Sequence, residues 1–137
     1  MERPDLGTLT SRLLREIVRR ETPILDRAGL EMWDYVILSA LLAGDAATQT
    51  ELATSTGRDK TRLIRNLDGL EERGLVTRSP DPADRRNKVV SLTTAGRRLV
   101  SSCRTAIRAM EKDLLAGLPA SERTALERSL LRLTTDG

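Results

Sequence analysis

The first third of the chain carries apolar residues at helical spacing. In the first segment they recur every three or four positions, at Leu6, Leu9, Leu13 and Ile17. We expect this helix to run to about Thr22, where Pro23 interrupts or kinks it. A second, nearly continuous apolar helix spans about Met32 to Leu42 and ends before Gly44. Because it is apolar on most sides, it belongs in the middle of the domain.

Two short helices joined by a glycine turn follow. Thr48-Gln49-Thr50-Glu51 is a capping box that opens the first of them, and Gly57 closes it because glycine tolerates a positive φ. Asp59 caps the second, which stops at Gly74 and presents an apolar face at Leu63, Leu67 and Leu70. Two short helices in this arrangement form a helix-turn-helix.

The rest of the chain predicts a β-hairpin and two more helices. Leu75–Arg78 and Lys88–Leu92 are short strands, and the prolines and acidic residues between them are typical of a turn. Thr93 caps a long fifth helix, and Pro119 separates it from a sixth. The expected fold is therefore mainly α with a small β-hairpin, an α+β single domain spanning residues 1–137.

Composition supports this fold and argues against catalysis. The chain is 39% hydrophobic with one Trp, one Tyr and no Phe, so its core is built from aliphatic residues, which favours helix packing. It has no His and a single cysteine, Cys103, and it lacks a nucleophile–base pair or a glycine-rich phosphate loop. Asp81 and Asp84 have too few oxygen ligands nearby for a metal site. We therefore expect no enzyme activity, no cofactor and no metal.

Neither a signal peptide nor an apolar run of about 20 residues is present, so we expect a soluble, cytoplasmic protein with no membrane partner.

The positive charge is concentrated in one segment. Residues 57–98 carry 11 basic and 6 acidic side chains, against 12 basic and 14 acidic ones elsewhere. On the second short helix, Thr61, Arg62 and Arg65 fall roughly opposite the leucine face. Short polar and basic side chains in this position suit the major groove of DNA, although such a pattern alone also describes an ordinary solvated face. The neighbouring helix-turn-helix favours double-stranded DNA as the partner.

The predicted hairpin loop is a second candidate for DNA contact. From Asp81 through Lys88 it holds three basic side chains, and Pro80 and Pro82 stiffen it. Arginine is suited to the narrow, electronegative minor groove, so Arg85 and Arg86 are candidate contacts. Asp84 is expected to shape the loop by accepting hydrogen bonds from the backbone or from a nearby arginine.

Four strings in register resemble successive landmarks of the MarR family of winged helix-turn-helix regulators. They are Gln49-Thr50-Glu51-Leu52-Ala53, Leu70-Glu71-Glu72-Arg73-Gly74-Leu75-Val76, Asp81-Pro82-Ala83-Asp84-Arg85-Arg86 and Leu92-Thr93-Thr94-Ala95-Gly96. Each string alone is weak, but their order and spacing match over some fifty residues. The resemblance implies a DNA-binding lobe at about 30–98, with helical dimerisation arms at about 1–28 and 99–137.

The resemblance also implies roles for individual residues. The protein would be a homodimeric repressor on a palindromic operator, and the expected base-reading positions are Lys60, Thr61, Arg62 and Arg65. Arg86 or Arg85 would enter the minor groove, and Thr48 and Thr50 would contact phosphates. Two positions depart from the usual pattern, because Arg58 stands where an apolar residue is common and Ile64 where a small polar one is common.

Relatives of this kind often bind small aromatic effectors in a cleft beside the dimer arms. Trp33 and Tyr35 either line such a cleft or simply pack in the core. Peroxide-sensing relatives use a cysteine near the N-terminus, whereas Cys103 lies on the apolar stripe of the fifth helix and is expected to be buried and inert. The rival to a DNA-binding regulator is a winged helix that binds protein, which would lack a basic outward helix and hairpin.

Overall fold

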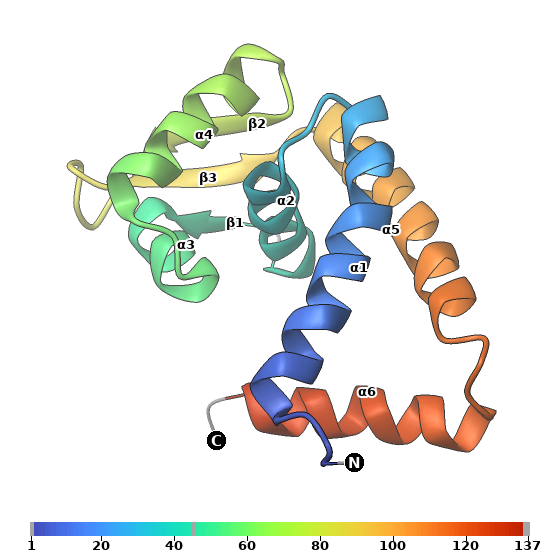
Figure 1. Ribbon diagram of the computed structural model, residues 1–137. Helices are drawn as coiled ribbons and strands as arrows, with labels where there is room; N and C mark the ends of the chain where they lie inside the picture. Colours follow the sequence, from blue (N-terminus) through green and yellow to red (C-terminus); the bar gives the residue numbers. More distant parts are fainter. Residues whose placement is uncertain (1, 45, 136–137) are drawn as a thin grey trace.

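The computed structural model describes residues 2–44 and 46–135. This part of the chain contains six helices and a small sheet (Figure 1). The helices, in order, are α1 (Leu6–Arg27), α2 (Met32–Gly44), α3 (Gln49–Thr56), α4 (Lys60–Glu72), α5 (Thr94–Leu114) and α6 (Ala120–Thr134). The strands are β1 (Ala46–Thr48), β2 (Val76–Pro80) and β3 (Lys88–Leu92). The expected class, mainly α with a small amount of β, is confirmed.

The sheet holds one strand that the hydrophobic pattern does not predict. Its order is β1-β3-β2, with both neighbouring pairs antiparallel. β2 and β3 form the predicted hairpin, and Val76 pairs with Leu92. β1 is only three residues long and pairs Ala47 with Val90. A strand this short shows no alternation of its own, so only its partner β3 reveals it.

The centre of the molecule is α2, as its continuous apolar character predicts. Ile37, Leu38 and Leu41 are fully buried, and the helix packs against α3, α4, α5 and the sheet. The core around it is aliphatic and draws on nearly every element. Its other members include Leu25, Leu30, Leu52, Leu63, Leu67, Leu70, Val76, Val90, Val100 and Ile107.

The prediction that the first helix ends near Thr22 is wrong. α1 continues through Pro23 to Arg27. The proline removes one backbone hydrogen bond and costs roughly 3 kcal/mol in a helix interior. Leu25, only 2% exposed, and Ile24 pack into the core beyond it, and this burial offsets the cost.

The elements divide into two groups in space. Figure 1 shows α3, α4 and the sheet gathered on one side of α2, whereas α1, α5 and α6 form the sides of a triangle on the other. We call the first group, together with α2, the lobe. None of the helices in residues 2–44 and 46–135 has the length and hydropathy needed to cross a membrane.

Candidate nucleic-acid interface

Local capping interactions set the geometry of the helix-turn-helix. Thr48 accepts a hydrogen bond from the Glu51 N–H (3.1 Å), and the Glu51 carboxylate accepts one from the Thr48 N–H (3.0 Å). Gly57 ends α3 at φ +71°, a conformation that costs glycine little. Asp59 then caps α4 by accepting from the Arg62 N–H (3.2 Å). The predicted caps are therefore confirmed, and α4 starts at Lys60.

α4 has one buried and one basic face. Leu63, Leu67 and Leu70 are buried against the lobe, as the leucine pattern predicts. Thr61, Arg62 and Arg65 are exposed on the other side, and their side chains hydrogen-bond to no other described residue. Their donors are therefore available to a partner.

The two threonines beside this face differ in the hydrogen bonds that their hydroxyl groups already make. Lys60 Nζ donates to the Thr50 hydroxyl at 2.9 Å, so α3 and α4 are joined at their N-terminal ends. The Thr48 oxygen already caps α3, and only its O–H remains to donate. Thr50 and Lys60 are exposed, and Thr48 is half-buried.

The hairpin loop is braced from within and presents two exposed arginines. Asp84 Oδ1 accepts from the Arg86 N–H (3.1 Å), and Asp81 Oδ1 accepts from the Ala83 N–H (3.0 Å). The loop is closed by the Asp81 N–H bond to the carbonyl of Asn87 (3.1 Å). Arg85 and Arg86 lie exposed on this frame. We call residues 76–92 the wing.

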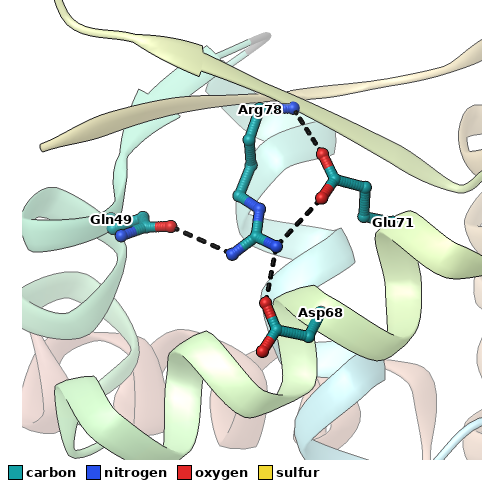
Figure 2. A network of polar contacts seen from close by, with 4 residues as sticks. All are labelled: Gln49, Asp68, Glu71 and Arg78. Atoms are coloured by element: carbon teal, nitrogen blue, oxygen red, sulfur yellow. Dashed lines mark hydrogen bonds and ion pairs between the residues drawn. The ribbon is translucent and has the colours of Figure 1, made fainter.

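A polar cluster that sequence reasoning missed joins the wing to α4. Figure 2 shows the Arg78 guanidinium between residues of two helices. It donates to Asp68 Oδ1 (2.6 Å), to Glu71 Oε1 (2.9 Å) and to Gln49 Oε1 (3.2 Å). The Arg78 backbone N–H also donates to Glu71 Oε2, at 3.2 Å. One residue of β2 therefore contacts α3 and α4 at once.

The charges in this cluster stabilise one another. The hydrogen bond from Arg78 holds the pKa of the Glu71 carboxyl below its ordinary value. Burial disfavours the charged form of Arg78, but its hydrogen bonds to Glu71 and Asp68 outweigh burial and raise the pKa of the guanidinium. Gln49, which is 5% exposed, meets one of the guanidinium N–H groups. The cluster is thus a charged contact with matched partners.

Arg58, one of the two positions that the resemblance marks as unusual, makes contacts with α2 and α4. Its guanidinium lies over the Trp33 ring, 4.7 Å from the ring centroid, and its Nε donates to Asn66 Oδ1 at 3.1 Å. Asn66 in turn donates to Asp34 Oδ1 (2.9 Å). The cation–π contact therefore joins the turn before α4 to α2, and the bond between Asn66 and Asp34 joins α4 itself to α2.

The two candidate cleft residues are both half-buried. Tyr35 packs against the core, and Trp33 lies under Arg58. The described residues also form a polar hollow of about 420 Å³, and neither aromatic residue lines it. Its walls include Asp34, Arg65 and Arg73.

An apolar hollow of about 890 Å³ lies between α1, α5 and α6. Leu13, Ile17, Leu115 and Leu126 are among the residues that line it. Arg123 also lines it, and its buried Nε has no partner among the described residues. Large apolar side chains are exposed on the same helices, namely Leu6, Leu14, Leu131 and Leu133. The last of these is 82% exposed. An isolated chain leaves this apolar surface in water.

Cys103 is buried on α5, as the apolar stripe predicts. Burial raises the pKa of its thiol, which disfavours the reactive thiolate.

Known proteins resemble this chain over nearly its whole length. The sequence profile of the MarR family matches residues 28–87. The HTH-type transcriptional repressor NicR of Pseudomonas putida is 31% identical over 126 residues, which cover 89% of this chain and 80% of NicR.

Two solved structures have the same fold with different molecules bound. A mutant MarR from E. coli, complexed with operator DNA, has a TM-score of 0.82 and 27% identity, covering 95% of this chain and 94% of its own. CouR from Rhodococcus jostii, bound to p-coumaroyl-CoA, has a TM-score of 0.81 and 29% identity, covering 97% of this chain and 95% of its own.

Proposed function

This chain belongs to the MarR family and is a DNA-binding transcriptional regulator, and we propose that it acts as a repressor that holds a palindromic operator as a homodimer. The observation that supports this most is the basic face of α4, where Thr61, Arg62 and Arg65 are exposed and bond to no other described residue, beside a wing with arginines at its tip. As a regulator of DNA it would work in the cytoplasm.

The contacts divide by groove. Lys60, Thr61, Arg62 and Arg65 enter the major groove and read bases, because they lie on the N-terminal half of α4. Arg86 or Arg85 enters the adjacent minor groove from the wing tip. Thr48 and Thr50, near the start of α3, donate to phosphates.

Selection of bound sequences from a random DNA pool tests this function directly. We expect a two-fold symmetric site with half-sites about 34 Å apart, and a slope of affinity against salt that reports the phosphate contacts. Recovery of no common sequence, together with binding that is weak at physiological salt, would instead favour the winged helix that binds protein.

The proposed dimer is supported by the apolar hollow and by the exposed leucines of α1 and α6. A second copy is the natural cover, because the arms of a two-fold dimer present the same surface to each other. Changing Leu131 and Leu133 together to Asp should give a folded monomer by light scattering, with operator affinity lower by about 100-fold or more because the half-sites are no longer linked. Ser129→Asp, on the same helix but outside the hollow's lining, is the control. A double variant that stays dimeric would contradict this assignment.

Release by a small aromatic molecule is the finer part of the proposal. It is supported by the likeness to CouR, whose structure holds p-coumaroyl-CoA. Titrating aromatic acids and their CoA thioesters into the protein–operator complex tests it. Loss of the complex at micromolar ligand is the expected result. Trp33→Leu and Tyr35→Leu separate the two roles, because a cleft residue affects the response to ligand, whereas a core residue affects Tm.

The wing makes a prediction that separates binding from stability. Replacing both Arg85 and Arg86 with Ala should leave Tm nearly unchanged, because these exposed side chains contact no core. Operator affinity should fall, and the salt slope should flatten by about 0.9 for each phosphate contact removed. Asp84→Ala removes an acceptor that braces the loop, so it should lower Tm as well. Undiminished affinity in the double variant at physiological salt would remove the wing from DNA binding.

A further inference from the structure

Arg78 occupies a core-facing position of the wing. Along β2 the side chains alternate, with Val76 buried and Thr77 exposed, so Arg78 shares the inward face of Val76. Its cross-strand partner, Val90, is fully buried. The Arg78 side chain is only 15% exposed, although it carries a charge. Burying a charge in this position costs free energy unless the charge is paired. The hydrogen-bond partners of Arg78 are therefore what allow its guanidinium to be buried.

Its partners come from α3 and α4, the two helices that the proposed function places on DNA. Gln49 is 29 residues away at the start of α3, and Asp68 and Glu71 lie on the C-terminal half of α4. Glu71 accepts from both the guanidinium and the backbone N–H of Arg78, so strand and side chain are tied together. Asp68 and Glu71 fasten the C-terminal half of α4 to β2 (Figure 2), whereas Arg62 and Arg65 in its N-terminal half bond to no other described residue.

We propose that Arg78 is a positioning residue for DNA reading, which sets the wing at a fixed distance and angle from α4. In this way Arg62 and Arg65 meet the major groove while the wing tip meets the minor groove. The inference rests on the proposed function, because it assigns to one residue the coupling between two contact surfaces. Residues that preorganise a binding surface improve affinity by lowering the ordering cost on association.

Charge neutralisation is the competing explanation, because Asp68 and Glu71 would otherwise repel DNA. Arg78→Lys separates the two. Lysine keeps the positive charge, but it lacks the planar fork that donates to three acceptors at once. If charge alone matters, this variant binds the operator like the wild type.

A double-mutant cycle tests the coupling. Operator affinity is measured for the wild type, Arg78→Lys, the double Ala variant of Arg85 and Arg86, and their combination. We expect Arg78→Lys to weaken binding about tenfold when the wing is intact and less than twofold when the wing arginines are absent. Equal losses in both backgrounds would overturn the proposal, as would wild-type affinity in Arg78→Lys.

Amide hydrogen exchange of the free protein gives a second measurement that needs no DNA. Exchange in residues 76–92 should be faster in Arg78→Lys, while α5 is unchanged. Arg19→Lys, which alters the exposed ion pair with Glu16 (2.6 Å) on α1, is the control and should leave the wing unaffected. Unchanged wing exchange would overturn the anchoring role. A wild type that binds no DNA would instead overturn the proposed function, and the exchange result would still decide whether Arg78 holds the wing.

Discussion

Replacing Arg62 and Arg65 together with Ala is expected to abolish most discrimination between operator and random DNA. Each bidentate arginine–base contact contributes about 1–3 kcal/mol of discrimination, and a two-fold dimer makes each contact twice. Both side chains are exposed on α4 and bond to no other described residue, so their removal leaves the fold intact. Competition binding against random DNA, with Tm measured on the same samples, gives the result.

The single variants refine the assignment. Arg65→Lys should recover only part of the discrimination, because lysine lacks the planar fork. Arg128→Ala, an exposed arginine on α6, should leave binding unchanged and controls for net charge. Equal weakening on operator and random DNA would show that Arg62 and Arg65 contact phosphates rather than bases.

The parts of this interface that sequence predicts are those decided by near neighbours. The caps at Thr48, Asp59 and Thr93 act on N–H groups three residues away, so residue type and spacing suffice to find them. The buried face of α4 follows from helical periodicity alone. Helix geometry then places Arg62 and Arg65 on the exposed face opposite it.

The parts that sequence does not predict depend on how separate elements pack against one another. Arg78 sits in an apparently ordinary strand, and only the packing of β2 on α4 brings Asp68 and Glu71 to it. The alternation of Val76 and Arg78 was the available signal, because it places a charge on the buried face. Likewise, nothing local in Arg58 indicates that Trp33, 25 positions earlier, lies beneath its guanidinium. Tertiary packing also carries α1 through Pro23, against the local preference of proline.

The need for glycine at position 96 becomes clear only from the folded structure. This glycine closes the string Leu92-Thr93-Thr94-Ala95-Gly96 and lies in the first turn of α5, where its N–H donates to the Thr93 hydroxyl (3.0 Å). A Cβ at this position would lie 2.0 Å from the carbonyl oxygen of Leu75. That same oxygen accepts the Thr93 N–H at 3.1 Å. The missing side chain therefore lets α5 start directly against the residue that precedes β2.

Gly96→Ala is accordingly expected to lower the free energy of unfolding by about 3 kcal/mol or more, since the clashing atom is backbone and cannot rotate away. For a chain of this size, that corresponds to a fall in Tm of roughly 10 °C, measured at one protein concentration because dimer stability depends on it. Gly69→Ala is the matched control. Its Cβ would meet nothing within 4 Å, and it lies inside α4, so the higher helix propensity of alanine should stabilise the protein by up to about 1 kcal/mol. The same substitution thus has opposite signs at two glycines, and a Tm that is unchanged in Gly96→Ala would contradict the close approach of α5 to Leu75.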